Sequence, residues 1–434
     1  MAHPLDESPW RRAHWVLFAI VSLSFLLDGV LFSLVPLVAY ILPVLEPYAT
    51  YIFAANSLAY LLGALIFGKI SDAVGRRAGL VISLALYTAA SIVFAAAFWL
   101  NALGLAAAFL LTSIINFGVG GEIGPAFSAL AEFSPARHRG KALMLAANFW
   151  NIGAAVIAGL SLVYSALSSD PHVVVLSIFG TAVALALVVL AARLHLPESP
   201  RWLAARGRIA EARKIVAAFA GVEADPPPQP EGVGLRDAVR TKALGLAVLA
   251  TVSAANVVTY NIAAYYLPYA PGFPYGADAA PVIVAVANAG ASIGAFLLLP
   301  LIDRSRKISL TSAYLGGLLT ALLFWYLAQR AAPFAPFLAA LWVNAIFAEW
   351  SWGSLGVLES ELFPTGVRAT VVGLVTGIAW GVNTALVAVE SSVDAPTFMA
   401  MNAAVWAAGV IAAVIWHIKG RESARRTLEE LQRG

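Results

Sequence analysis

One ten-residue stretch occurs twice in this chain, and the repetition decides its architecture. Residues 131–140 are AEFSPARHRG, and residues 360–369 are SELFPTGVRA. The matched positions, each 229 residues apart, are Glu132 with Glu361, Pro135 with Pro364 and Arg139 with Arg368. A second motif, GKISDAVGRR at residues 68–77, has a degraded copy, LPLIDRSRK, at residues 299–307. Motifs that recur at nearly one offset indicate two homologous halves produced by duplication.

The segments between these motifs are long and apolar. Of the 434 residues, 61% are hydrophobic and 12% are charged, against about 45–50% and about 25% in soluble domains. A helix needs about 20 apolar residues to cross a bilayer. Such segments lie at approximately 15–43, 50–68, 79–100, 103–131, 142–167, 172–194, 242–268, 279–301, 309–328, 335–361, 369–390 and 397–417. The expected fold class is all-α integral membrane, with 12 transmembrane helices in two pseudo-symmetric six-helix bundles.

The same composition excludes several functional classes. So few charges leave no basis for a disordered chain, a fibre or a nucleic-acid-binding domain. The chain has no cysteine, which excludes disulfides and cysteine-ligated metals. No nucleophile–base pair, metal cluster or phosphate loop stands out, so we expect no enzyme activity, no cofactor and no metal. The first apolar segment is too long for a signal peptide.

The distribution of basic residues predicts the orientation. Of the 27 Lys and Arg residues, all except Arg330 fall on one side of the predicted spans, which is the cytoplasmic side by the positive-inside rule. Both termini are therefore expected in the cytoplasm of a multi-pass cell-membrane protein. The expected domains are an N-terminal bundle at 1–194, a cytoplasmic linker at 195–240, a C-terminal bundle at 241–418 and a tail at 419–434. Within the linker, residues 204–221 predict an amphipathic helix, and the proline-rich residues 226–230 predict an extended segment.

Five motifs and the C-terminal tail, spread along the chain, resemble segments of the major facilitator superfamily. Residues 68–77 resemble its loop between the second and third helices. Residues 132–140, 197–203 (PESPRWL) and 361–368 resemble the sugar-porter and organic-cation-transporter branch, and residues 261–268 (NIAAYYLP) resemble the seventh helix of sugar porters. The tail, with Lys419-Gly420 and then Leu428-Glu429-Glu430, resembles that branch's ending. The resemblance implies the major facilitator fold and solute transport by alternating access, and we expect a monomer.

The sequence also departs from sugar porters in two helices. Their fourth helix carries an arginine, whereas this chain has LLTSIIN at residues 110–116. Their fifth helix carries a sugar-facing glutamine, whereas FWNIG at residues 149–153 is closer to organic-cation and metabolite-symporter relatives.

Three acids lie in the middle of predicted spans: Asp28, Glu122 and Glu349. At 1.5 Å per residue, each lies roughly 18–21 Å from its cytoplasmic helix end. Because no Lys or Arg lies mid-span, we expect these acids to lack a basic partner and to couple transport to protons. The family fold implies that they converge on one central cavity. The alternative for Asp28 and Glu122 is a neutral acid hydrogen-bonded to a neighbouring helix.

The expected substrate-binding residues are polar or aromatic and near mid-span: Asp28, Glu122, Asn256, Tyr260, Asn261, Tyr265 and Trp352. Aromatic rings stack on sugars or hold cations, although many membrane aromatics only fill the core or anchor the interface. An acidic cavity disfavours an anionic solute and favours a sugar-like solute or an organic cation. We expect proton symport as the mode of transport. Proton-antiport export of organic cations and a non-transporting receptor remain alternatives.

Charged residues and glycines at the cytoplasmic helix ends form the predicted cytoplasmic gate: Gly68, Asp72, Gly75, Arg76, Arg77, Glu132, Arg139, Glu198, Arg201, Glu361 and Arg368. In the resembled family such pairs join the halves in outward-facing states. Although an exposed ion pair contributes only about 0–1 kcal/mol, a network biases a two-state equilibrium. The alternative, that these charges only set topology, is compatible with this role.

Overall fold

The computed structural model describes residues 3–42, 45–226, 235–330, 332–364, 367–389, 392–426 and 430–431. Within these ranges, 12 helices are long and apolar enough to cross a membrane, which confirms the predicted fold class. The first six are α2 (Arg12–Val38), α3 (Ala49–Val74), α4 (Arg76–Trp99), α5 (Leu105–Phe133), α6 (Arg139–Leu167) and α7 (Pro171–Arg193). The second six are α11 (Ala243–Asn261), α12 (Ala280–Ile302), α13 (Arg306–Gln329), α14 (Phe334–Leu362), α15 (Arg368–Ala388) and α16 (Ala395–Lys419).

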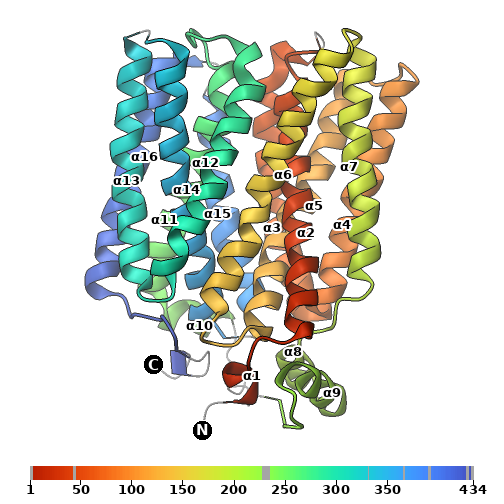
Figure 1. Cartoon of the computed structure of the whole chain (residues 1–434), viewed down its shortest axis with the longest axis vertical. Coiled ribbons are helices and arrows are strands. Elements are labelled where there is room, and N and C mark those ends of the chain that lie inside the picture. Colours follow the sequence, from red (N-terminus) through yellow and green to blue (C-terminus); the bar gives the residue numbers. More distant parts are fainter. Residues whose placement is uncertain are drawn as a thin grey trace.

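The two sets of six helices form two adjacent bundles (Figure 1). The short helices α1 (Pro4–Glu7), α8 (Pro200–Ala205), α9 (Ile209–Ala220) and α10 (Leu235–Thr241) lie together at one end of the molecule, which we call the termini end. Of the predicted proline-rich stretch, residues 227–230 lie outside the described residues. Large apolar side chains such as Leu110, Leu319 and Ile411 are exposed on the bundle surface, as a lipid-facing wall requires.

The amphipathic helix of the linker is α9, and its apolar face explains its position. Ala212, Val216 and Phe219 are buried, and the Phe219 ring packs against His14 at 4.9 Å and Phe133 at 4.5 Å. The helix ends at Gly221, whose φ of 76° is left-handed and is readily adopted by glycine. This packing fixes the linker against the termini end of the N-terminal bundle.

The two bundles meet along α3 with α15 and α6 with α12. Small residues permit the close approach of α3 and α15, because a Cβ at Gly68 would lie 2.7 Å from the carbonyl oxygen of Ala369 and one at Gly373 would clash with that of Ala64. The repeated motifs occupy equivalent places, since α6 begins at Arg139 and α15 begins at Arg368. The duplication in the sequence is therefore visible in the helix ends.

Candidate functional site

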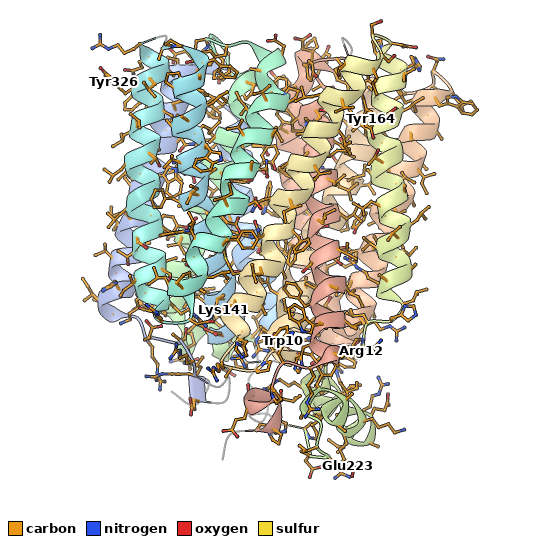
Figure 2. The ribbon with its side chains drawn as sticks, in the orientation of Figure 1. Trp10, Arg12, Lys141, Tyr164, Glu223 and Tyr326 are labelled. Atoms are coloured by element: carbon orange, nitrogen blue, oxygen red, sulfur yellow. The ribbon has the colours of Figure 1, made fainter. Side chains whose placement is uncertain are left out.

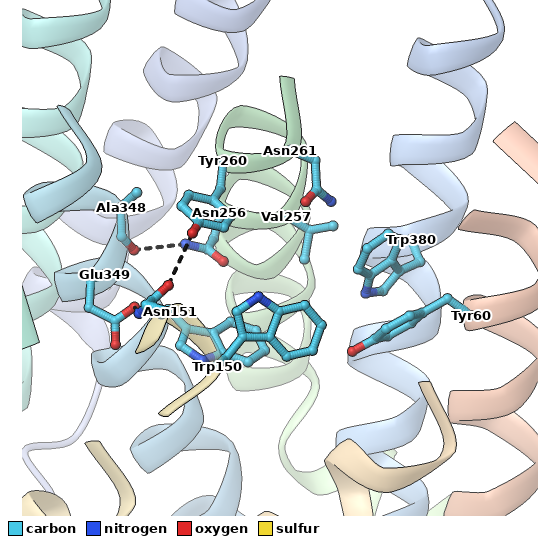
Figure 3. A pocket seen from close by; sticks show the side chains of 11 residues that line it. Tyr60, Trp150, Asn151, Asn256, Val257, Tyr260, Asn261, Ala348, Glu349 and Trp380 are labelled. Carbon is cyan, nitrogen blue, oxygen red and sulfur yellow. Dashed lines mark hydrogen bonds between the residues drawn. The ribbon is translucent and has the colours of Figure 1, made fainter. Parts of the chain in front are cut away.

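A cavity lies between the two bundles at mid-height (Figure 3). It is lined by Tyr60 of α3, Trp150 and Asn151 of α6, Asn256, Val257, Tyr260 and Asn261 of α11, Ala348, Glu349 and Trp352 of α14, and Trp380 of α15. The cavity has a volume of about 50 Å³. That interior has room for a few water molecules, so its walls must separate to admit an organic solute.

The polar wall of the cavity is a hydrogen-bonded cluster around Glu349. Asn151 Nδ2 donates to Glu349 Oε2 at 2.6 Å, and Tyr260 Oη donates to Asn151 Oδ1 at 3.0 Å and to Asn288 Oδ1 at 2.6 Å. Glu349 Oε1 is buried and has no hydrogen-bond partner. An unpartnered acceptor in the cavity wall is costly to leave unsatisfied, so Glu349 is the strongest candidate for contacting a solute.

A second polar point is Asn256, one turn of α11 away from Tyr260. Its Nδ2 donates to the carbonyl oxygen of Ala348 at 2.9 Å and to Ser351 Oγ at 2.6 Å; Figure 3 shows the bond to Ala348. These bonds hold the amide against α14, and its side-chain oxygen is not among the buried atoms left without a partner. Asn256 therefore orients the wall that carries Glu349.

The remaining wall is aromatic. Tyr60 and Trp380 are stacked, with ring centroids 3.9 Å apart and planes at 25°, and they lie across the cavity from Glu349 (Figure 3). Trp150 and Trp352 complete this lining. Aromatic faces attract cations and stack on flat or sugar-like rings. The cavity thus combines one carboxylate with several rings.

The residues predicted to bind the substrate or protons lie in two places rather than in one. Five line the cavity: Glu349, Asn256, Tyr260, Asn261 and Trp352. Asp28, Glu122 and Tyr265 do not. Tyr265 instead donates to Asn288 Oδ1 at 3.3 Å, behind the polar cluster. The expected convergence of all three acids is therefore not found.

The expectation that the mid-span acids lack a basic partner is wrong for Glu122. Arg193, the last residue of α7, is fully buried and forms a two-point ion pair with Glu122, including a bond from Nη1 to Oε1 of 2.6 Å. Arg193 also donates to Ser24 Oγ at 3.0 Å. The Cα lies at a helix end, but the long side chain extends inward past apolar surface and places its charge inside the bundle.

Asp28 lies beside this ion pair but does not share it. Its side chain is completely buried, and its carboxyl group lies beside that of Glu122. The charged groups near it are Glu122 and Arg193. Tyr60 is close enough to Asp28 and Glu122 to be affected by their charges, and it also lines the cavity. This tyrosine is therefore common to the surroundings of the buried charges and of the candidate solute site.

Two residues that shape the cavity, Asn151 and Tyr60, were not among the substrate-binding residues expected from the sequence. Asn151 belongs to the FWNIG stretch on α6, where its position relative to Glu349 required the packing of α6 against α14. Tyr60 lies within an apolar helix, and only its contacts distinguish it from core aromatics. Among the described residues, no group of three or more His, Asp and Glu side chains is placed to hold a metal ion.

Predicted gate residues close the termini end across the two bundles. Arg368 Nη1 lies 2.9 Å from Glu132 Oε1. Asp72 Oδ2 accepts from the backbone N–H of Thr370 at 2.7 Å and from its hydroxyl at 2.6 Å. Gly75, between α3 and α4, has a φ of 113°, which non-glycine residues rarely adopt. This end of the pathway is shut.

Other gate residues work within one bundle, and the two bundles repeat the same arrangement. Glu198 accepts from the backbone N–H groups of Arg76 at 2.8 Å and Arg77 at 3.3 Å. Glu422 accepts equivalently from Arg306 at 3.0 Å and Lys307 at 3.5 Å. The hydroxyl groups complete the correspondence, since Ser199 donates to Glu132 and Ser423 donates to Glu361. The tail segment around Glu422 therefore corresponds to the PESPR segment after α7, a match that sequence analysis missed.

Arg139 and Arg201 have a partner that sequence analysis did not propose. Asp6 of α1 pairs with Arg139 at 2.7 Å and with Arg201 at 3.0 Å. Burial alone would raise the pKa of Asp6, but the charges of Arg201 and Arg139 outweigh it and lower the pKa below 3.8. These ion pairs hold the N-terminal segment against the termini end of the N-terminal bundle.

The opposite end of the pathway is also closed. Tyr269 Oη donates to the carbonyl oxygen of Pro36 at 2.8 Å, and the rings of Phe53 and Tyr266 stack at 5.0 Å. Each contact joins the N-terminal to the C-terminal bundle. The structure therefore shows an enclosed cavity with contacts between the bundles above and below it.

Two six-helix bundles closed around a shared cavity define a multi-pass membrane protein of the transporter type, not an enzyme. A family model described as "Sugar (and other) transporter" matches residues 38–434. The chain belongs to this sugar (and other) transporter family.

Comparison with individual proteins agrees with this assignment. The chain is 32% identical to the inner membrane metabolite transport protein YgcS of Escherichia coli over 224 residues, 50% of this chain and 48% of that protein. It is 30% identical to the minor myo-inositol transporter IolF of Bacillus subtilis over 34% of this chain and 32% of the relative. These matches span about half of the relatives' length or less. The structure of the proton:xylose symporter XylE aligns with a TM-score of 0.78 and 19% identity, covering 96% of this chain and 98% of XylE, which shows the shared fold.

Proposed function

We propose that this protein is a secondary active transporter that moves a small organic solute by proton-coupled alternating access, as a symporter. Its family is one of transporters, and its structural neighbour XylE is a proton:xylose symporter. The observation that carries the proton coupling is the complete burial of the Asp28 carboxyl group beside the carboxyl group of Glu122. A buried carboxyl group next to a second one is accommodated by taking up a proton, so it is suited to bind and release one during a transport cycle.

Arg193 provides the charge compensation that such a cycle needs. Its guanidinium pairs with Glu122 and lies near Asp28. When Asp28 releases its proton, Arg193 is the nearby cation that stabilises the new carboxylate, and the Glu122–Arg193 pair loosens accordingly. Tyr60 lies within range of the charges of Asp28 and Glu122 and lines the cavity, so a solute that displaces Tyr60 changes the environment of Asp28. Solute binding and protonation are thereby linked.

The solute site is the cavity around Glu349. A neutral, sugar-like solute would hydrogen-bond to Glu349 Oε1, Asn151 and Asn256, and its ring faces would stack on Trp352 or Trp380. The small volume of the enclosed state requires the α6–α14 contact between Asn151 and Glu349 to lengthen when the solute enters. Binding therefore acts on a contact between the two bundles, which is where alternating access requires a ligand to act.

A second function, proton-antiport export of organic cations, is favoured by one observation. The unpartnered oxygen of Glu349 faces a cavity that also contains Tyr60, Trp150, Trp352 and Trp380. One carboxylate with several ring faces is an arrangement that binds quaternary and alkylated amines. Protonation of Glu349 would then compete with the cation, which gives exchange rather than symport.

A thermal-shift screen of the purified protein with sugars, polyols, organic amines and aromatic acids tests these proposals. A ligand should stabilise the wild type by an amount that grows with the logarithm of one plus its concentration over its Kd, and it should lose this effect in Trp352→Ala. Uptake of that ligand into proteoliposomes then separates a transporter from a receptor. Ligands that bind but never cross the membrane would contradict the transport proposal.

A further inference from the structure

A groove on the outer wall of the termini end takes no part in the pathway described above. It runs between the start of α2 and the start of α6, is lined by Trp10, Trp15, Phe18, His138, Lys141, Ala142 and Leu145, and contains about 670 Å³ of empty space. Trp10 forms its aromatic corner, with ring centroids 5.7 Å from Trp15, 6.5 Å from Phe18 and 6.4 Å from His138. Trp15 is 60% exposed.

The rim of this groove is basic. Lys141 has a side chain that is 46% exposed, and Arg12 and Arg137 are exposed nearby in the chain. Figure 2 shows Trp10, Arg12 and Lys141 at the same end of the bundle, where the transmembrane helices begin. Aromatic rings at a helix end are typical of the level where lipid headgroups meet acyl chains. The groove therefore combines an apolar lining with the positive charge of Lys141.

We infer that this groove binds an acidic phospholipid from the leaflet at the termini end. An acyl chain fits against Trp15, Phe18 and Leu145, and the headgroup phosphate lies beside Lys141. Basic pockets between transmembrane helices recognise anionic headgroups in this way. The charge complementarity selects an acidic lipid over a zwitterionic one.

Lys141 connects the bound lipid to the contacts between the two bundles. Its ammonium lies 3.8 Å from Asp303 Oδ2, and this contact joins α6 of one bundle to the end of α12 in the other. A phosphate beside Lys141 competes with Asp303 for its charge, whereas Asp303 keeps its bond with Arg306 at 3.1 Å. The lipid therefore weakens one contact between the bundles and favours opening of the termini end.

Lipid binding to the full-length protein is measurable by native mass spectrometry in detergent, with phosphatidylglycerol and phosphatidylcholine added separately. The wild type should bind phosphatidylglycerol more tightly, and Lys141→Gln should bind it about fivefold more weakly, the factor that one surface lysine contributes. Lys419→Gln, an exposed lysine at the end of α16, is the matched control and should bind like the wild type. Trp15→Ala should weaken both lipids. Glycerol phosphate, which has no acyl chains, should not displace the lipid.

The effect on the gate is tested separately in vesicles. Ser354→Cys introduces a single reporter thiol on α14, at a fully buried position whose hydroxyl has no hydrogen-bond partner. Phosphatidylglycerol in the vesicles should speed its labelling, and Lys141→Gln should remove that dependence. Equal binding of the two phospholipids, unchanged binding by Lys141→Gln, displacement by glycerol phosphate, or labelling that ignores lipid composition would each overturn the inference.

Discussion

Asn151 on α6 and Glu349 on α14 are joined by a hydrogen bond of 2.6 Å, and this bond connects the two six-helix bundles in the wall of the cavity. The other oxygen of Glu349 has no partner. A solute that reaches this carboxylate must therefore alter a contact between the bundles. In the proposed mechanism, the solute site is also part of the interface that moves in alternating access.

Replacing Glu349 with Gln should separate cationic from neutral solutes. The substitution keeps the shape and removes the charge, so binding of an organic cation should weaken at least about tenfold, because a buried charge loses its partner. A neutral solute should lose less than about threefold. Isothermal calorimetry with hits from both classes measures the difference, and Glu223→Gln, an exposed acid of the linker, is the control. Identical losses for both classes would show that the charge of Glu349 plays no part in selection.

Removing one partner of the Glu122–Arg193 ion pair should destabilise the protein more than removing both partners. Glu122→Gln or Arg193→Met leaves an unpaired charge inside the N-terminal bundle, which costs about 3–5 kcal/mol. The double variant Glu122→Gln/Arg193→Met removes both charges and should recover most of the thermal stability. Melting temperatures of the three purified variants decide this. A double variant as unstable as the sum of its parents would contradict the direct pairing.

The contacts between bundles at the termini end should control access to the pathway. Arg368→Gln removes the Arg368–Glu132 ion pair, and Asp72→Asn weakens the bonds to Thr370, so either change should speed labelling of Ser354→Cys by a thiol reagent. Glu361→Gln should have a smaller effect, because its partners Arg306 and Ser423 belong to its own half of the protein. Equal labelling rates in the parent and all three variants would mean that these charges set only topology.

Asp6 predicts a pH dependence of stability. Its pKa in the folded protein is lower than 3.8, despite its burial, because of Arg201 and Arg139. A carboxyl with a lowered folded pKa contributes stability above its unfolded pKa and loses it as the pH falls through the folded value. The stability difference between the wild type and Asp6→Asn should be constant above about pH 5 and shrink below 3.8. A difference that grows on acidification would contradict this assignment.

The fold was predictable because internal sequence repeats and long apolar segments indicate it. The segments expected at 142–167 and 172–194 are the helices Arg139–Leu167 and Pro171–Arg193. Long apolar runs leave a membrane chain no alternative to helix, and the motif around Glu132 and Glu361 shows the duplication directly.

The candidate site was only partly predictable. Glu349 and Asn256 stood out as polar residues at mid-span, and both line the cavity. The position of a residue along a helix determines where its Cα lies but not where a long side chain ends. The sequence therefore did not indicate that the Arg193 side chain extends to Glu122. The pairing of Asp6 with Arg139 joins segments separated by 133 residues, and no local pattern marks such a contact.

Solute uptake by proteoliposomes under an imposed proton gradient tests the central claim most directly. With a ligand from the binding screen, the wild type should accumulate solute above its external concentration when the outside is acidic. A protonophore should abolish this accumulation. Asp28→Asn should retain exchange of internal for external solute but lose accumulation, because it removes the proton site and leaves the cavity intact. Concentrative, gradient-driven uptake by Asp28→Asn, or uptake by the wild type that ignores the gradient, would contradict proton coupling through this residue.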